Sequence, residues 1–166
     1  MSLPKLETKI TALGYLEGEK ISPIKHEFVE GEIYAMAGGT GDHNLISGEL
    51  YGLLWEHLRG SKCQPYINDI RVRVTKSVSY YPDVLVSCEE NPEDPHLRNN
   101  PVLIIEVTSP STENVDRREK LLFYQQMPTV QEYLVVDQHQ MMRYIAARHT
   151  ADGSPLILIK RLTLWN

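Results

Sequence analysis

The sequence predicts a single α/β (α+β) domain in which helices and β-hairpins precede a strand–helix–strand unit. At 166 residues, with 42% hydrophobic and 23% charged residues, the chain has the size and composition of one globular domain with a substantial core. Apolar runs at residues 102–108 and 132–137 flank a helix-like segment, and this order forms a right-handed crossover when the two strands are parallel. We find no internal repeat and no linker, so we expect residues 1–166 to form one domain.

The first half of the chain predicts two helices around a hairpin. Residues 1–25 are expected to hold a short helix and a loop, because apolar side chains recur there at helical spacing. Residues 26–36 place two apolar stretches around a Glu-Gly pair, which predicts a hairpin. A second helix is expected over residues 42–59, with Thr40 or Asp42 as its cap. Its predicted apolar stripe consists of Leu45, Ile46, Leu50, Leu53, Leu54 and Leu58.

The second half predicts mainly strands. Residues 71–75 alternate in polarity and residues 80–87 are more continuously apolar, so we expect a hairpin whose second strand is the more central. Residues 89–100 are polar and contain prolines, which predicts a solvent-exposed loop. The remaining expected elements are a strand over residues 102–108, a helix over 112–127, a strand over 132–137, and a final hairpin of residues 142–147 with 156–162.

Composition and charge exclude several classes of protein. No apolar run approaches the roughly 20 residues that cross a bilayer, and residues 1–10 lack the apolar core of a signal peptide, so a cytoplasmic location is expected. Cys63 and Cys88 form neither a disulfide framework nor a zinc-ligand pattern, which fits that compartment. The formal net charge of −5 argues against sequence-independent coating of DNA but leaves room for a local basic cleft.

Two carboxylates interrupt otherwise apolar strands. Asp83 begins one strand, and Glu106 lies in the middle of another. Adjacent strands can bring such groups within a few ångströms, where they repel each other unless a cation intervenes. Oxygen ligands suit Mg²⁺ or Mn²⁺, and Val107 can add its backbone carbonyl. We therefore predict that Asp83, Glu106 and Val107 hold a metal ion, and that Lys120 orients the activated water or neutralises charge at phosphorus.

Simpler roles compete with these. Asp83 can end a turn, and Glu106 can pair with Lys120 for structural reasons alone. Asp116 and Lys120 are also four residues apart, the spacing of a helical ion pair that is worth only about 0.2–0.5 kcal/mol on an exposed surface. The joint arrangement of two acids and a lysine favours the catalytic interpretation, with Lys120 only slightly ahead of its structural alternative.

Other polar residues carry less weight. His43, next to Asn44 at the start of the second helix, can reach the site or a phosphate, but a capping or packing role fits equally well. Tyr124 follows Lys120 by one helical turn, and tyrosines in such positions are mostly core or rim residues. A solvated charged face is the safer interpretation for the four arginines that are candidates for phosphate contacts, Arg71, Arg73, Arg117 and Arg118.

The order of motifs resembles the Uma-type restriction endonuclease family of the PD-(D/E)xK nuclease superfamily. The resemblance spans about residues 10–146 and rests on a series of short motifs rather than on one of them. These are His26-Glu27, Glu30-Gly31-Glu32, Asp42-His43-Asn44, Pro82-Asp83, residues 106–112, Asp116, Lys120 with Tyr124, Glu132-Tyr133 and Val136-Asp137. The resemblance implies a restriction-endonuclease-like fold, a mixed central β-sheet flanked by helices.

The resemblance also implies a site. Asp83 and Glu106 would be the metal-binding acidic pair, and Glu27 would be the N-terminal acid aimed at the same metal. Nucleases of this pattern carry lysine two residues after the second acid, where this chain has Thr108, whereas Lys120 matches a migrated lysine on the next helix. The implied reaction is hydrolysis of DNA phosphodiester bonds with Mg²⁺ or Mn²⁺, by a homodimer that cuts two strands.

The alternative is a catalytically inactive family member that acts as a binding or assembly protein. The acidic net charge of this chain favours this alternative modestly. The sequence also contains no DNA-reading module such as a zinc finger or a basic helix. A fold alone does not establish an activity, so the arrangement of the site residues has to decide between the two.

Overall fold

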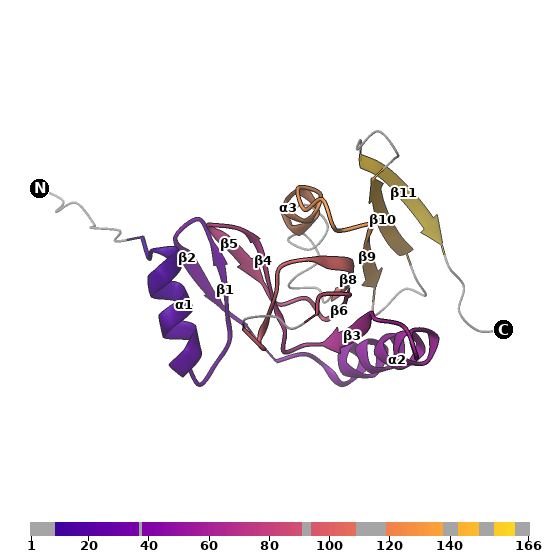
Figure 1. Cartoon of the computed structure of the whole chain (residues 1–166), viewed down its shortest axis with the longest axis horizontal. Coiled ribbons are helices and arrows are strands. Elements are labelled where there is room, and N and C mark those ends of the chain that lie inside the picture. The colour runs from indigo at the N-terminus through magenta and orange to yellow at the C-terminus, as the bar shows by residue number, and fades with distance from the viewer. Residues whose placement is uncertain are drawn as a thin grey trace, which may run out of the picture.

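Two mixed β-sheets with helices beside them form the chain, as the computed structural model in Figure 1 shows. The structure describes residues 9–36, 38–90, 94–108 and 119–137, and the backbone of residues 143–149 and 155–161. The α+β class is confirmed, whereas the one central sheet that was expected is divided into two. The elements are α1 Ala12–Ile21, β1 His26–Val29, β2 Glu32–Ala35, α2 Gly41–His57, β3 Gln64–Ile67, β4 Arg71–Thr75, β5 Val78–Tyr80, β6 Val84–Ser87, β7 Leu97–Arg98, β8 Pro101–Thr108, α3 Leu121–Tyr124, β9 Glu132–Asp137, β10 Arg143–His149 and β11 Pro155–Arg161.

The smaller sheet has the strand order β2-β1-β5-β4-β7 and contains the predicted hairpin of residues 26–36. Glu30 and Gly31 both have positive φ, 50° and 97°, as the tight turns that join twisted hairpin strands require. The expected first helix, α1, lies beside this hairpin (Figure 1) and is attached by Tyr15, whose ring stacks on Phe28 at 4.7 Å. The leucines of α1 contribute less to this attachment, because the side chain of Leu13 is 65% exposed.

The larger sheet has the order β11-β10-β9-β8-β6-β3. β8 and β9 are parallel, with Ile104 opposite Tyr133, so the predicted strand–helix–strand unit is present. Of the helix expected over residues 112–127, the structure describes a short helix, α3, and residues 119–120 before it; Asp116, Arg117 and Arg118 lie outside the described residues. β10 and β11 pair antiparallel and confirm the final hairpin.

The two faces of β8 lie in separate parts of the core, because successive side chains of a strand point to opposite faces. Ile104 belongs to a cluster that includes Tyr124 and Tyr133, on the side of α3. Ile105 and Val107 belong to a second cluster, which three residues of α2 cover: Ile46, Leu50 and Leu54. The predicted helix over residues 42–59 is therefore confirmed, although its apolar stripe is narrower than expected, because Leu45 is 72% and Leu53 55% exposed.

Two predictions about strands are wrong. Residues 80–87 do not form one strand, because β5 and β6 belong to different sheets and residues 81–83 connect them. Pro82 at the centre of this connection has no N–H to continue a β-ladder. The loop expected at residues 89–100 contains β7, which pairs in parallel with β4 and buries Leu97 and Arg98.

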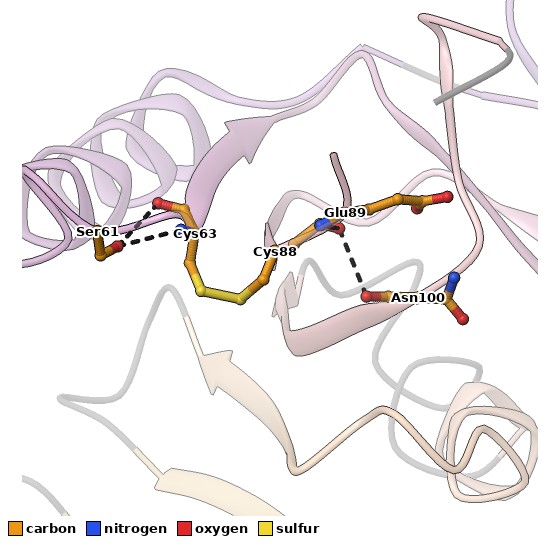
Figure 2. Close-up of a disulfide and its surroundings, with 6 residues drawn as sticks. Ser61, Cys63, Cys88, Glu89 and Asn100 are labelled. Atoms are coloured by element: carbon orange, nitrogen blue, oxygen red, sulfur yellow. Dashed lines mark hydrogen bonds between the residues drawn. A yellow bond between two sulfur atoms is a disulfide. The ribbon is translucent and has the colours of Figure 1, made fainter. Parts of the chain in front are cut away.

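The interpretation of the cysteines is also wrong. Cys63 and Cys88 form a disulfide, drawn in Figure 2. Gln64 lies opposite Ser87 in the antiparallel pair of β3 and β6, and one further step in this register brings the two cysteines face to face. The sequence reasoning missed the disulfide because it missed β3. Within the described residues, no helix has the length and apolar character to cross a bilayer.

Candidate active site

The two predicted carboxylates lie near each other in the larger sheet. Asp83 immediately precedes β6, Glu106 lies within β8, and these two strands pair antiparallel with Val84 opposite Ile105. Successive side chains of a strand point to opposite faces, so Glu106 shares the face of Ile104, on which α3 packs. Asp83 instead reaches the backbone N–H of Val107 and contacts His43 of α2, the helix that covers the other face.

Glu106 belongs to a buried ion cluster, which we define as Glu27, Glu106 and Lys120 together with Tyr124. The side chain of Lys120 places Nζ 3.2 Å from Glu106 Oε1 and 2.9 Å from Glu27 Oε1. The hydroxyl of Tyr124 donates to the same Glu106 oxygen at 3.3 Å. Glu106 is 3% and Lys120 6% exposed, so their ion pair lies away from bulk water, while the side chain of Glu27 is 17% exposed.

The cluster joins the two sheets. Glu27 comes from β1 in the smaller sheet, Glu106 comes from β8 in the larger sheet, and Lys120 immediately precedes α3. The structure thus brings together Glu27, Glu106 and Lys120, and their catalytic and metal-binding roles stay predictions. The structural alternative for Lys120, its pairing with Asp116, falls partly outside the described residues.

Two tyrosines surround the ammonium group of Lys120. Its Nζ lies 5.3 Å from the centre of the Tyr80 ring, within the range of a cation–π contact, and the Tyr80 hydroxyl donates to Glu119 at 2.9 Å. Burial, together with the neighbouring Glu119, raises the pKa of Tyr80 well above its usual value. Burial and the Glu106 carboxylate do the same to the pKa of Tyr124. Both hydroxyls therefore remain neutral hydrogen-bond donors; the role of Tyr80 was not predicted, since it looks in the sequence like one more strand residue.

Asp83 makes a different set of contacts. Its Oδ2 accepts a 2.7 Å hydrogen bond from the backbone N–H of Val107 and lies 3.2 Å from His43 Nε2. The Val107 N–H, rather than its carbonyl, is thus the group that the structure places against an acidic side chain. The side chain of Asp83 is 15% exposed, so unlike Glu106 it lies at a boundary with solvent.

His43 reaches Asp83 from the first turn of α2. Thr40 caps this helix by accepting a hydrogen bond from the His43 N–H at 3.2 Å, so the capping role belongs to Thr40. A Cβ at Gly39 would lie only 2.8 Å from His43 Nδ1, which means that glycine lets the preceding loop pack against the imidazole. Of the two roles that the sequence left open for His43, the structure supports contact with the site.

A cavity of about 380 Å³ opens beside Asp83, and we call it the Asp83 cavity. Its polar lining comes from four further residues: Lys25, His43, Asn44 and Asn68. Asn68 follows β3, has a positive φ of 59°, and donates its backbone N–H to the carbonyl of Asp83 at 2.9 Å. A small molecule or one unit of a polymer fits a cavity of this size.

The acidic pair fits a magnesium-type site in which water supplies most of the ligands. Mg²⁺ keeps several waters and is commonly held by one or two carboxylates. Asp83 uses Oδ2 for both of its contacts, and its Oδ1 takes part in no hydrogen bond among the described residues. Within those residues, no group of three or more His, Cys, Asp and Glu side chains converges as a metal cage. The carboxylate oxygens of Asp83 and Glu106 are therefore of the chemical type that binds a hydrated divalent cation.

Comparison with known proteins gives the family. The model of the Uma2 family, described as "Putative restriction endonuclease", matches residues 15–148. The chain belongs to this family. Two proteins of Synechocystis sp. are similar: "Uncharacterized protein slr1290", 37% identical over 77% of this chain and 68% of that protein, and "Uncharacterized protein sll1609", 38% identical over 79% and 77%.

A solved structure gives the same fold. The "putative nuclease belonging to DUF820 from Anabaena variabilis" superimposes with a TM-score of 0.71, covering 91% of this chain and 85% of that one, at 18% identity. At this identity the likeness concerns the fold alone, and it confirms the fold class that the motifs implied.

In this Uma2 chain, Thr108 has a structural role at the position where the resemblance led us to look for lysine. Thr108 stands two residues after Glu106, is buried, and donates its hydroxyl to the carbonyl of Val136 on β9 at 3.4 Å. That side chain is thus part of the contact between β8 and β9. Lys120, which precedes α3, supplies the cation beside Glu106.

Proposed function

We propose that this Uma2 protein is a metal-dependent endonuclease that hydrolyses phosphodiester bonds in DNA. The observation that carries the proposal is the acidic pair Asp83, directly before β6, and Glu106, on the neighbouring β8, with Lys120 beside the second acid. Membership of a family described as restriction endonucleases supports the nuclease class. Mg²⁺ or Mn²⁺ is the proposed cofactor, because hard oxygen ligands at this spacing suit those ions.

Each residue of the site has a proposed role. Asp83 and Glu106 hold the metal ion, with the Val107 carbonyl as a further ligand. When bound, the ion lowers the pKa of a coordinated water and offsets negative charge on the phosphate. Lys120 fixes the Glu106 carboxylate and presents positive charge to the reacting phosphate, and Glu27 holds Lys120 in place from the other sheet.

The proposal includes a homodimer in the cytoplasm. A double-strand cut needs two copies of a site that hydrolyses one bond at a time, which is the reason for a dimer. The Cys63–Cys88 disulfide argues against the cytoplasm, because disulfides are more common in oxidising compartments. The oxidation state of the two cysteines in protein extracted under thiol-trapping conditions therefore tests the location.

The second candidate is a catalytically inactive protein of the same fold that binds or assembles with a partner. The observation that favours it is the contact set of Glu106, whose Oε1 already receives Lys120 and Tyr124. If these contacts use all the hydrogen-bonding capacity of the Glu106 carboxylate, Glu106 has a structural role only and no metal binds.

The decisive experiment combines metal binding and cleavage on the same samples. Mn²⁺ is titrated calorimetrically into wild type, Asp83→Asn and the control Glu56→Gln, which removes an exposed charge on α2, and each protein is then assayed for nicking of supercoiled plasmid. We expect wild type and Glu56→Gln to bind and to nick, and Asp83→Asn to lose both. Metal binding without nicking would retain the site and leave its substrate open. Absence of metal binding by wild type would replace the nuclease with the inactive binding protein.

A further inference from the structure

The Asp83 cavity contains two carboxamides that the proposed reaction does not use. Asn44 comes from the first turn of α2 and Asn68 from the residue after β3, and both line the cavity beside Asp83. Among the described residues, neither side chain takes part in a hydrogen bond within the protein. A carboxamide offers two hydrogen-bond donors and one acceptor oxygen. Two carboxamides that line one cavity therefore suit a ligand that presents both a donor and an acceptor.

The position of Asn68 is fixed relative to the acidic pair. Its N–H donates to the carbonyl of Asp83, so the two residues lie side by side. Its φ of 59° belongs to the left-handed region, which Asn tolerates better than most residues and Gly tolerates best. The backbone preference accounts for Asn or Gly at this position, but it does not account for a second carboxamide at Asn44, which lies within an α-helix.

Positively charged groups also line the cavity, beside the Asp83 carboxylate. Lys25 lines it and forms an ion pair with the exposed Asp69. Gly38, Gly39 and the first turn of α2 line it as well, and the N-terminus of a helix of 17 residues carries partial positive charge. A ligand that combines a phosphate with a hydrogen-bonding ring system matches both features.

We propose that the Asp83 cavity binds the nucleobase next to the phosphodiester at the acidic pair, and that Asn44 and Asn68 read its edge with a preference for adenine. The proposal rests on the nuclease function for the identity of the ligand as a nucleotide. Adenine is the base that a carboxamide matches best, because its N6 donor and N7 acceptor pair with the oxygen and the amino group of one Asn. The volume of about 380 Å³ belongs to the range of roughly 300–1,000 Å³ that is typical of small-molecule sites.

Mononucleotides test this site independently of cleavage. They contain no phosphodiester bond, so the four 2′-deoxynucleoside 5′-monophosphates can be titrated into wild type with Mg²⁺ present while the side-chain amide signals of Asn44 and Asn68 are followed by NMR. We expect dAMP to bind most tightly and to shift both signals. Asn68→Gly keeps the backbone conformation and removes the carboxamide, so the preference for dAMP should fall at least about 5-fold.

A second substitution at Asn68 is expected to change which base is preferred. Asn68→Asp keeps the size of the side chain but can only accept hydrogen bonds, as recognition of the cytosine N4 amino group requires. We expect this variant to favour dCMP over dAMP. The matched control is Asn99→Asp, an exposed asparagine in the segment between β7 and β8, which should bind the four mononucleotides as wild type does.

The outcomes separate this inference from the nuclease proposal. Selective binding of dAMP, lost in Asn68→Gly, supports the base site even if no DNA substrate is cut. Binding of the four mononucleotides with equal affinity, or a preference unchanged in Asn68→Gly, overturns it even if plasmid is nicked. Failure of all four to shift the signals of Asn44 and Asn68 at millimolar concentration also overturns it.

Discussion

Asp83 and Glu106 are neighbours across one pair of strands, yet their surroundings differ sharply. Glu106 is enclosed in the buried ion cluster with an ammonium group and a tyrosine hydroxyl, whereas Asp83 borders a cavity and contacts an imidazole and a backbone N–H. A hydrolytic site needs both conditions, since fixed charges require exclusion of water and a substrate requires access. The contrast therefore divides the acidic pair into a positioning half and an open half.

The positioning half depends on charge balance. The buried Glu106, the partly buried Glu27 and one ammonium group leave a net charge of minus one among these three side chains, and the charges of Glu106 and Lys120 were removed from water at a cost. Removal of one partner from such a set destabilises a protein by more than the set itself contributes, because the remaining charges are left unpaired. The open half carries a smaller penalty, because Asp83 borders a cavity and its carboxylate contacts the Val107 N–H and His43.

The largest effect is expected from Lys120→Met. It leaves Glu27 and Glu106 facing each other without a cation, and we expect the free energy of unfolding to fall by about 3–5 kcal/mol. Urea denaturation followed by circular dichroism measures the change. Adding Glu27→Gln and Glu106→Gln to Lys120→Met should restore much of the loss, because no unpaired charge then remains. A single variant as stable as wild type would show that the cluster is hydrated rather than buried.

The disulfide provides the next largest effect. It joins the ends of β3 and β6 that lie away from Asp83, as the strand register shows, and Figure 2 shows it between the two strands. Replacing both cysteines with serine should lower the free energy of unfolding by about 3 kcal/mol. Because Asn68 is bonded to Asp83 at the other end of the same strand pair, nicking by the folded protein should persist.

Reduction of wild type with dithiothreitol provides the control for that prediction. It should reproduce the stability loss of Cys63→Ser/Cys88→Ser, and the same reductant should leave the double variant unchanged. Equal stability of wild type in oxidised and reduced form would mean that the cysteines are unpaired in solution.

A smaller effect, confined to activity, is expected at His43. Its Nε2 lies 3.2 Å from Asp83 Oδ2, so His43 orients Asp83, a proposed metal ligand, without binding the metal. His43→Ala should lower nicking at least about 10-fold, and His43→Gln, which retains a donor, should recover part of it. The free energy of unfolding should change by less than about 1 kcal/mol, in contrast to Lys120→Met. Equal activity of the Ala and Gln variants would contradict an orienting hydrogen bond.

The sequence predicted the positioning half better than the open half. A carboxylate at Glu106 is unusual inside an apolar strand, and the sequence shows this directly. The order of motifs then added Asp83, Lys120 and Glu27 as candidates. Glu27 and Glu106 lie on strands that the sequence predicted, β1 and β8. The strand–helix–strand order was predicted as well, and the structure adds that β8 and β9 pair in parallel, the condition for a crossover connection.

The open half depends on contacts that no local pattern contains. His43 meets Asp83 because α2 packs across one face of the larger sheet, and Asn68 meets Asp83 because β3 pairs with β6. β3 was not expected, since Gln64-Pro65-Tyr66-Ile67 is short, begins with a polar residue and contains proline. Without that strand, neither the disulfide nor the wall of the cavity could be predicted.

The buried ion cluster finally predicts a dependence of stability on alkaline pH that the open half lacks. Burial and Glu106 hold the pKa of Tyr124 well above the ordinary value of 10, which the unfolded chain retains. Below pH 10 its contribution to stability is complete, and it is lost as the pH rises through the folded pKa, because the unfolded state releases its proton first. Tyr15, whose pKa burial raises to about 12, adds to the same loss between pH 10 and 12.

Tyr124→Phe isolates this contribution. It removes a buried hydroxyl and its hydrogen bond to Glu106, so we expect the free energy of unfolding at neutral pH to fall by about 1 kcal/mol. The phenylalanine cannot ionise, so the fall in stability between about pH 9 and pH 11 should be shallower than in wild type. His43→Gln should follow the wild-type curve, because its contacts are with Asp83 and not with a buried hydroxyl. Parallel curves for wild type and Tyr124→Phe would place that hydroxyl in contact with water and remove the distinction between the two halves of the site.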